Sequence, residues 1–445
     1  MNKLFGTDGI RGKADKFPLD FSSVYTLGKT LALLLMEKGI SPKIIIGRDT
    51  RESGPVLEQA IIQGVEDVQG EALSAGVIPT SAVSYLTTHF DFSAGVVISA
   101  SHNPYEDNGI KIFSSSGMKI PQEWEHKLEK AILTNTKEIK EVEREIIPES
   151  SLSRKYSEFI KSKFTFGKIE GNFKLILDCS NGAASFFAPG IFSDLGFEVI
   201  ALNGKPDGKN INLDCGSLYP QGLAQAVIEN NADMGIAYDG DADRALWVDD
   251  KGRLLNGDHT LYVMAGHMLD QGTLRSKCVV ATPMSNMGLE KSLKKQGIEL
   301  VRAPVGDRFV LEEMLRSKAN LGGEQSGHTI FLDDCPTGDG ILTSIKMLEV
   351  MIHRDVPLSQ LVNGLEEFPQ VLLTVDVCRK EDFNAYPEIK DMMRNIQKSL
   401  GSKGRLNVRY SGTEPVARIM IEGEDHKNIT VMADGLAQVI IKYLG

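Results

Sequence analysis

A short apolar strand that ends in small and polar residues recurs three times along this chain, each time followed by helix-like sequence and a second strand. The first strands of the three units lie in KIIIGRDT (43–50), FKLILDCSNGAA (173–184) and CVVATPMSNMG (278–288), and the second strands end in the loops ISASHNP, AYDGDADR and GGEQSGH. Alternation of strands and helices predicts parallel α/β sheets. Recurrence of the whole unit predicts three related α/β domains in series.

The three polar loops are expected to face one cleft, because ligands of open α/β sheets bind beyond the carboxyl ends of the strands. Near the C-terminus the pattern changes: RLNVRYSGTEPVARIMIEG reads as two strands around a tight loop, which predicts a smaller α+β domain. The charged segment 138–156 is predicted to join the first two units. The expected domains, each with one loop, are 1–153 (SASHNP), 154–254 (DGDADR), 255–367 (GGEQSGH) and 368–445 (RYSGTEP).

Composition argues against several classes of partner. The formal net charge of −11 disfavours nucleic acid and anionic membrane surfaces. The longest purely apolar stretch, LALLLM, is far shorter than the roughly 18 residues that a membrane span needs, and the N-terminus lacks the apolar core of a signal peptide. The five cysteines show no C-x-x-C spacing, so neither a disulfide framework nor a zinc site is indicated. These features predict a cytoplasmic protein.

The sequence DGDADR places three carboxylates, Asp239, Asp241 and Asp243, directly after the apolar segment MGIAY. Alternate residues of an extended segment point the same way, and Gly240 allows a tight bend, so the three side chains are predicted to converge. Three oxygen donors suit a hard divalent cation, and Mg²⁺ is the expected ion. An EF-hand loop also spaces acids in this way, but it requires glycine at the position of Arg244 and a preceding helix. A polar surface turn is the third reading.

The loop RYSGTEP is predicted to bind phosphate. Ser411 and Thr413 supply hydroxyl groups, Gly412 lets the backbone approach a ligand, and Arg409 supplies positive charge. An ordinary Ser-Gly hairpin turn is the alternative, but Arg418 on the following strand adds a second cation and favours phosphate binding.

Ser101, in SASHNP, is predicted to carry a phosphoryl group. A phosphoserine has a charge of about −1.5 to −2, so beside three aspartates it needs a cation, and three carboxylates with one phosphate oxygen fill much of an Mg²⁺ coordination shell. One alternative is a hydrolase triad with Ser101 and His102, although adjacent residues are not expected to meet as nucleophile and base; another is a serine that only caps a helix. Lys111 and His328 are candidates for moving the proton of a substrate hydroxyl. In GGEQSGH, Glu324 and Ser326 offer polar groups that suit sugar hydroxyls.

Five motifs, FGTDGIRG, SASHNP, DGDADR, GGEQSGH and RYSGTEP, occur in the order and spacing of the α-D-phosphohexomutase superfamily, which the chain resembles over essentially its whole length. Gln325 and the stretches PDGKNINLDCGS (206–217) and TGDGILT (337–343) resemble the bacterial branch that acts on glucosamine phosphates. The resemblance implies four α/β domains round a central cleft, three alike with mixed or parallel sheets and the last a smaller α+β domain. It also implies a homodimer.

The resemblance further implies an isomerase that interconverts glucosamine 6-phosphate and glucosamine 1-phosphate, supplying UDP-N-acetylglucosamine synthesis. A phosphoserine enzyme would form glucosamine 1,6-bisphosphate as the intermediate, with one Mg²⁺ in the active site and an amino-sugar phosphate as substrate. The implied roles are metal binding for Ser101, Asp239, Asp241 and Asp243; transfer chemistry for Arg11, His102, Lys111 and Arg244; sugar binding for Glu324 and Ser326; and phosphate binding for Arg409, Ser411, Gly412, Thr413 and Arg418.

Leu218, Tyr219 and Tyr410 are larger or more apolar than is usual among relatives and leave the preference at the sugar C2 position open. A phosphoglucomutase or phosphomannomutase on the same scaffold is therefore an alternative. From other classes, an Mg²⁺-dependent sugar-phosphate phosphatase and a non-catalytic sugar-phosphate-binding or Ca²⁺-binding protein also remain.

Overall fold

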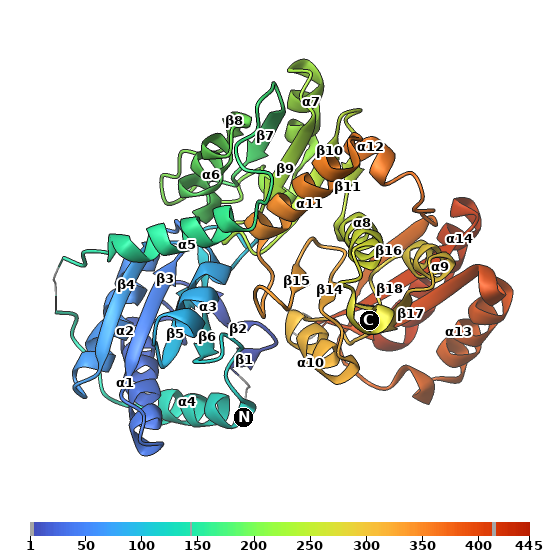
Figure 1. The fold of residues 1–445 in the computed structure, drawn as a ribbon. Helices are drawn as coiled ribbons and strands as arrows, with labels where there is room; N and C mark the ends of the chain where they lie inside the picture. The colour runs from blue at the N-terminus through green and yellow to red at the C-terminus, as the bar shows by residue number, and fades with distance from the viewer. Residues whose placement is uncertain (1–3, 143–144, 412–414) are drawn as a thin grey trace. The chain divides into compact units, whose positions relative to one another are not determined.

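The unit predicted from the sequence occurs three times in the computed structural model, which describes residues 4–142, 145–411 and 415–445 (Figure 1). Each occurrence contains two helical crossovers rather than the single one expected, and ends with an antiparallel strand. In all three sheets the four strands of the unit are arranged in the order fourth, third, first, second. This shared order confirms the α/β fold class with mixed sheets.

The first sheet has the order β1-β2-β6-β5-β3-β4, in which β3, β4 and β5 are parallel. Every residue of β5 is buried, as expected for a strand covered by helices on both faces. The elements of this domain are β1 (Phe5–Gly6), β2 (Gly9–Lys13), α1 (Phe21–Glu37), β3 (Lys43–Arg48), α2 (Gly54–Glu66), β4 (Glu71–Val77), α3 (Thr80–His89), β5 (Ala94–Ile98), β6 (Asp107–Ser114) and α4 (Gln122–Thr134).

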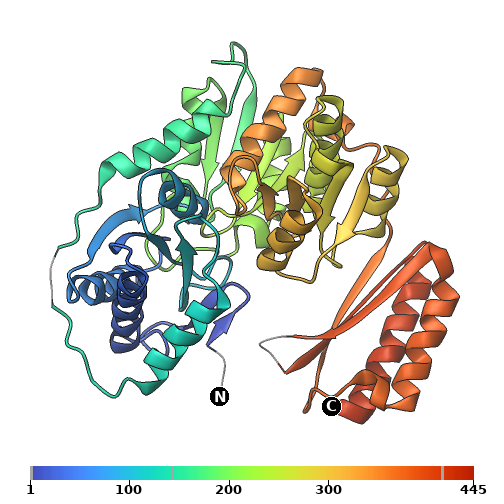
Figure 2. The same ribbon diagram turned by 60° about the horizontal axis from the view of Figure 1, so that its bottom comes forward.

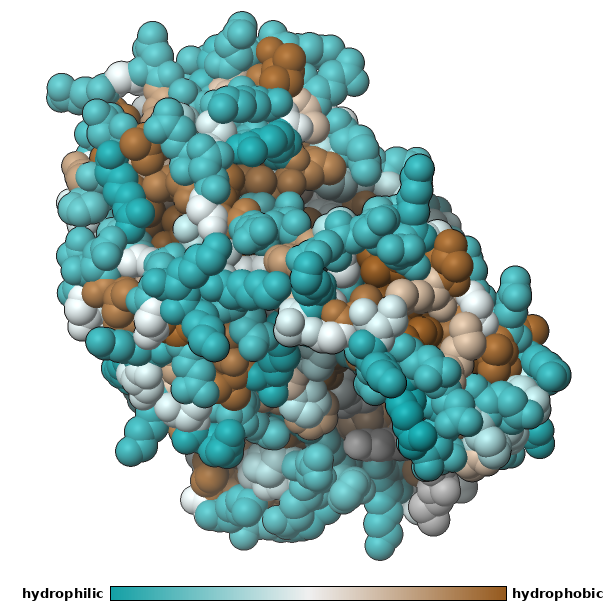
Figure 3. Space-filling view, turned by 90° about the vertical axis from the view of Figure 1, so that its right-hand side faces the viewer, coloured by the Kyte–Doolittle hydropathy of each residue, from teal (hydrophilic) through white to brown (hydrophobic). Residues whose placement is uncertain are grey.

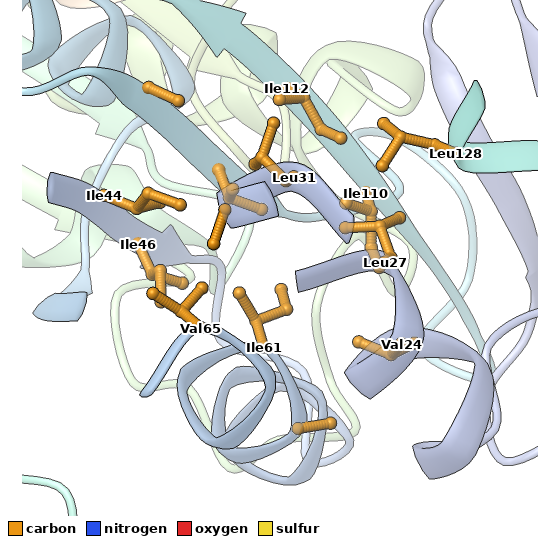
Figure 4. Packing of buried hydrophobic residues seen from close by; sticks show 14 of the residues in the cluster. Val24, Leu27, Leu31, Ile44, Ile46, Ile61, Val65, Ile110, Ile112 and Leu128 are labelled. Carbon is orange, nitrogen blue, oxygen red and sulfur yellow. The ribbon is translucent and has the colours of Figure 1, made fainter. Parts of the chain in front are cut away.

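Helices α1 and α2 pack together against apolar side chains of β3 and β6, and these residues form the core of the first domain (Figure 4). Glycines allow the close approach, because a Cβ at Gly28 of α1 would lie only 2.6 Å from the carbonyl oxygen of Ile61 in α2. Asp20 is the N-cap of helix α1, and its carboxylate accepts the Ser23 N–H at 3.0 Å and so satisfies a free donor of the first turn. This core supports the strand ends that carry the SASHNP loop.

The second sheet has the order β11-β10-β9-β7-β8. The segment 138–156, predicted as a connection, is partly helical, because α5 begins at Ser150 and its buried Leu152 and Tyr156 pack inside the protein. The elements are α5 (Ser150–Ser162), β7 (Lys174–Asp178), η1 (Ala183–Phe186), α6 (Ala188–Asp194), β8 (Glu198–Leu202), η2 (Gly216–Leu218), α7 (Gln221–Glu229), β9 (Met234–Tyr238), β10 (Ala245–Asp249) and β11 (Leu254–Leu255), where η denotes a 3₁₀ helix.

The third sheet has the order β13-β12-β14-β15. Its first helix in the chain, α8, begins with a capping box in which Asn256 and His259 exchange hydrogen bonds with each other's backbone. The elements are α8 (Gly257–Asp270), η3 (Arg275–Lys277), β12 (Cys278–Ala281), α9 (Met287–Lys295), β13 (Glu299–Arg302), α10 (Asp307–Ser317), β14 (Leu321–Gly323), β15 (Thr329–Phe331), α11 (Gly340–Arg354) and α12 (Leu358–Leu361).

The chain separates into two compact parts: residues up to 282 with 301–363, and residues 283–300 with 364–445. The second part contains an antiparallel sheet in the order β16-β18-β17, with α13 and α14 packed against it (Figure 2). It confirms the predicted smaller α+β domain, and the two predicted strands are β17 and β18. The elements are β16 (Gln370–Asp376), η4 (Phe383–Ala385), α13 (Pro387–Leu400), η5 (Gly401–Lys403), β17 (Gly404–Tyr410), β18 (Val416–Gly423) and α14 (His426–Leu444).

Hydrophilic side chains predominate on the face of the molecule drawn in Figure 3, with smaller apolar areas between them. Among the helices that the structure describes, none combines the length and the apolar character needed to cross a membrane.

Candidate active site

Ser101 and the aspartates of DGDADR, which belong to different repeats, meet in the structure. The Ser101 hydroxyl donates a hydrogen bond to Asp239 Oδ2 at 2.5 Å, and both side chains are buried. Ser101 follows β5, which is parallel to β3, and Asp239 follows β9, which is parallel to β7, so both lie beyond the carboxyl ends of parallel strands. The topology therefore places a hydroxyl nucleophile against an acidic cluster.

Ser101 and His102 lie closer than expected for adjacent residues, since Ser101 Oγ is 3.2 Å from His102 Nδ1. The expectation that they would not meet is wrong, because Ser101 has a left-handed backbone conformation (φ 51°) in which consecutive side chains do not point to opposite sides. Burial, followed by the charges of Arg244 and Arg11, lowers the pKa of His102 to about 3. The imidazole is thus too weak a base to activate serine as in a hydrolase triad.

The side chains of Asp239, Asp241 and Asp243 converge, with one oxygen from each lying within 4.8 Å of the others. They converge through a turn rather than along an extended segment, because Ala242 has a φ of 56° and its N–H donates to Asp239 O at 3.0 Å. The preceding segment is strand β9, and not the helix that an EF-hand requires.

Two oxygen atoms of this acidic cluster are available as metal ligands. Asp241 Oδ1 and Asp243 Oδ1 are buried and receive no hydrogen bond from the residues that the structure describes. Burial and then the charges of Asp243 and Asp241 raise the pKa of Asp239 well above its usual range. Carboxylates buried together without enough donors are costly, and a divalent cation supplies what they lack. The donor set therefore fits a hard metal ion.

Lys111, on β6, lies among carboxylates from three segments. Its Nζ is 2.9 Å from Asp241 Oδ2, 3.1 Å from Asp243 Oδ2 and 3.3 Å from Asp8 Oδ2. Burial opposes the charge of Lys111, but these three carboxylates hold its pKa well above the usual value. The ammonium group is therefore the counter-ion of the acidic cluster in this arrangement.

Asp8 connects this cluster to Arg11 and to Lys119, and sequence reasoning missed both Asp8 and Lys119. Asp8 accepts a hydrogen bond from Arg11 Nη2 at 2.5 Å and forms an ion pair with Lys119 at 2.7 Å. Lys119 also pairs with Asp307 at 2.6 Å, at the start of α10 in the third repeat. Asp8 stands inside the motif FGTDGIRG, so the signal was present, but its role depends on partners more than 100 residues away.

His328 belongs to the same site, because its Nδ1 is 3.7 Å from Asp243 Oδ2. Two contacts have opposite effects on the protonation of the His328 ring. The carboxylate of Asp243 raises the pKa of His328 against the effect of burial, whereas the Gly338 N–H, which donates to Nε2 at 3.0 Å, favours the neutral ring with its proton on Nδ1. The Gly338 contact leaves Nδ1 as the atom that can exchange a proton with the acidic cluster.

The turn between β14 and β15 carries the two residues predicted to bind sugar. Glu324 is half-buried and accepts the Gly306 N–H at 3.2 Å, and Ser326 is half-buried in the same turn. Arg244 and His328 pair as an isolated β-bridge, which brings this turn to the end of the acidic loop. All three polar loops of the repeats thus lie together in the first compact part of the chain.

In the second part, Arg409 and Arg418 face each other directly across β17 and β18. Ser411 follows β17, and its carbonyl accepts a hydrogen bond from Lys380 at 2.7 Å, so a third cation that the sequence did not reveal lies at this loop. Tyr410 stacks on a neighbouring aromatic ring with centroids 4.3 Å apart, as part of the domain core. Gly412 and Thr413 lie outside the described residues.

Four domains of the phosphoglucomutase/phosphomannomutase family match consecutive segments of the chain. Alpha/beta/alpha domain I matches residues 2–139, domain II residues 154–252, domain III residues 256–368 and the C-terminal domain residues 372–439.

Individual relatives show which branch of this family the chain belongs to. The phosphoglucosamine mutase of Geobacter sp. (strain M21) is 44% identical over 450 residues, covering 100% of this chain and 99% of its own length. That of Caldicellulosiruptor saccharolyticus is 44% identical over 446 residues, covering 99% of each. The chain belongs to the phosphoglucosamine mutase family. As a phosphoglucosamine mutase it is an isomerase that moves a phosphoryl group between positions of one sugar, as the five sequence motifs indicated.

Solved structures share the fold of this chain. A phosphoglucomutase/phosphomannomutase family protein from Burkholderia thailandensis has a TM-score of 0.80 at 23% identity, covering 98% of this chain and 97% of the other. The corresponding values for a putative phosphomannomutase from Thermus thermophilus are 0.76 and 20%, with 98% of each chain covered. At these identities the likeness shows the common fold.

Leu218 and Tyr219, the apolar departures within the phosphoglucosamine mutase pattern, lie at the surface with 47% and 48% of their area exposed. They follow the loop that packs beside Ser101.

Proposed function

We propose that this mutase interconverts glucosamine 6-phosphate and glucosamine 1-phosphate by carrying a phosphoryl group on Ser101. The observation that carries the proposal is the 2.5 Å hydrogen bond from Ser101 Oγ to Asp239 Oδ2. It puts the hydroxyl that would become phosphorylated against three carboxylates, two of which have a buried oxygen that receives no hydrogen bond from the described residues. A phosphate placed there would be repelled unless a cation stood between the two sets of negative charge.

In the proposed cycle, phosphoserine gives its phosphoryl group to the 1-hydroxyl of glucosamine 6-phosphate. The bond from phosphorus to Ser101 Oγ breaks and a bond to the sugar oxygen forms. Lys111 or His328, each of which carries a proton, would donate it to the departing Ser101 Oγ and would be reprotonated by the sugar hydroxyl. The product is glucosamine 1,6-bisphosphate. Return of its 6-phosphoryl group to Ser101 leaves glucosamine 1-phosphate and regenerates the phosphoserine.

Asp239, Asp241 and Asp243, together with a phosphoserine oxygen, would hold Mg²⁺. When bound, the ion would offset the charge of the phosphate and of its transition state. The proposal rests on the convergence of the three side chains and on the two buried oxygens that receive no hydrogen bond from the described residues.

The remaining residues would bind and orient the substrate. Arg11, His102 and Arg244 would surround the transferring group, and Glu324 and Ser326 would hydrogen-bond the sugar hydroxyls. The phosphate that is not being transferred would be held by Arg409, Ser411, Gly412, Thr413 and Arg418. The facing pair Arg409 and Arg418 supports this last role, because two adjacent guanidinium groups favour a shared anion.

Peptide mapping by mass spectrometry tests the proposal. After incubation with glucosamine 1,6-bisphosphate and Mg²⁺, we expect one phosphate on Ser101 and formation of glucosamine monophosphates in equal amount. A phosphatase would instead release inorganic phosphate and retain none on Ser101. Absence of phosphate from Ser101 after this loading step, or its presence on another residue, would contradict the carrier role.

Removal of the metal is expected to lower turnover by at least about 100-fold, because the ion supplies several kcal/mol of charge stabilisation. Chelation with EDTA followed by titration with MgCl₂ measures the loss and its recovery. Mg²⁺ at about 100 times its dissociation constant should also stabilise the folded protein by about 2.7 kcal/mol.

Asp241→Asn tests whether the acidic cluster is the origin of these effects, since it removes the charge of one ligand. It should abolish the Mg²⁺-dependent rise in melting temperature. Asp233→Asn, just before the same strand β9 but outside the cluster, is the matched control and should retain it. An unchanged Mg²⁺ response in Asp241→Asn would place the ion elsewhere.

A further inference from the structure

The backbone of the loop that presents Ser101 is held by side chains from two repeats. Arg51 Nη2 donates to Ser101 O at 3.0 Å and to Asn103 O at 2.8 Å. Asn212 Nδ2, from the second repeat, donates to the same two oxygens at 2.9 and 3.1 Å. Each carbonyl therefore accepts two hydrogen bonds, one from its own repeat and one from the repeat that carries the acidic cluster.

Asn212 lies in the stretch PDGKNINLDCGS, to which the proposed mechanism gives no role. This stretch packs on the first repeat at a second point, where the Glu52 N–H donates to Gly208 O at 3.0 Å. The acidic loop also lies close to the Ser101 carbonyl, because a Cβ at Gly240 would lie 2.6 Å from Ser101 O. The Ser101 carbonyl is thus enclosed by the second repeat and has little room to shift.

Ser101 needs such support because of its left-handed conformation, with a φ of 51°. A non-glycine residue in this region costs of order 1–3 kcal/mol and persists only where its surroundings determine it. Its N–H donates to Ser99 Oγ at 2.9 Å, and the Ser99 hydroxyl in turn donates to the buried Asp49 at 2.7 Å. Both backbone groups of Ser101 are therefore fixed, the N–H from the first repeat and the carbonyl from both.

We infer that Asn212 is a positioning residue for phosphoryl transfer, whose amide fixes the Ser101 carbonyl and hence the direction of Ser101 Oγ toward the acidic cluster. The inference rests on the proposed carrier role of Ser101. It adds that the phosphoserine loop is aligned by the repeat that holds the metal site, so that the two move as one body. A displacement of the reacting atom by about 1 Å costs on the order of 100-fold in rate.

Asn212→Ala tests this role without leaving a buried acceptor unpaired, because Arg51 still donates to both carbonyls. We expect kcat to fall about 10- to 100-fold with KM within about twofold of the original value. The single-turnover rate of transfer from loaded Ser101 to glucosamine 6-phosphate should fall by the same factor. Asn210→Ala is the matched control, since the Asn210 amide donates to Lys205 O within the same loop.

Asn212→Asp is the second variant. It keeps the size of the side chain but replaces the donor by a carboxylate that repels both carbonyls, so its rate should be no higher than that of Asn212→Ala. Hydrogen exchange of the peptide 99–107 should rise in both variants while the melting temperature stays near that of Asn210→Ala.

A single-turnover rate in Asn212→Ala equal to that of the unmodified protein would overturn the inference, as would a rise in KM alone or an equal loss in Asn210→Ala. Failure of the underlying proposal is distinguishable, because the unmodified protein would then carry no phosphate on Ser101 after loading and would transfer none.

Discussion

Ser101→Ala is expected to lower mutase turnover by about 10⁴-fold or more while the protein stays folded. The substitution removes the atom that would hold the phosphoryl group between its two positions on the sugar. The fold should survive because the bonds that hold this loop come from the backbone of Ser101, through its N–H and its carbonyl, and not from its hydroxyl.

Steady-state assays of glucosamine 6-phosphate conversion, with circular dichroism for folding, measure this result. Ser115→Ala, at an exposed serine shortly after β6, is the control and should behave as the unmodified protein. Turnover of Ser101→Ala near that of the control would show that the phosphoryl group travels by another route, for example through water or through a different side chain.

Lys111→Met is expected to destabilise the first compact part by about 3–5 kcal/mol in the absence of Mg²⁺, because it leaves buried carboxylates without their cation. The carboxylates of Asp8, Asp241 and Asp243 all lie within 3.3 Å of the ammonium nitrogen, and methionine fills the space without the charge. Turnover should also fall by about 10²- to 10⁴-fold, because Lys111 would no longer relay a proton from the sugar hydroxyl to Ser101 Oγ.

The stability effect has a specific signature. Mg²⁺ should recover part of the lost stability, since it can neutralise Asp241 and Asp243 directly. Lys13→Met is the matched control, because Lys13 pairs with Asp107 at 3.0 Å but is 57% exposed, and exposed pairs contribute about 0–1 kcal/mol. Denaturant titration with and without MgCl₂ measures the free energy of unfolding of both variants under both conditions. Equal stability of Lys111→Met and Lys13→Met without Mg²⁺ would contradict the role of Lys111 as counter-ion.

Much of the fold could be read from local patterns. Apolar strands ending in small polar residues identified β3, β7 and β12 and the strands before the three polar loops, because strand and turn propensities act over only a few residues. The second crossover of each repeat was missed, since its strands β4, β8 and β13 are less apolar and end without a distinctive loop.

The candidate site likewise contains features that the local sequence indicated and features that it did not. The spacing of Asp239, Asp241 and Asp243 directly after a buried strand indicated their convergence, although the turn that achieves it depends on the backbone of Ala242. The contact of Ser101 with His102 was judged wrongly, because sequence spacing assumes a conformation that the left-handed φ of Ser101 does not have.

The sequence alone predicts the three repeats and the final α+β domain. It also contains the motifs that identify the family and point to Ser101 and the three aspartates. All of these depend on residues that are neighbours in the chain. Only the tertiary structure shows that Lys111 neutralises the acidic cluster, that Asp8 and Lys119 extend its network, and that Arg51 and Asn212 hold the serine loop. Those contacts join segments about 50 to 130 residues apart, and their geometry is set by how the repeats pack, which no local pattern encodes.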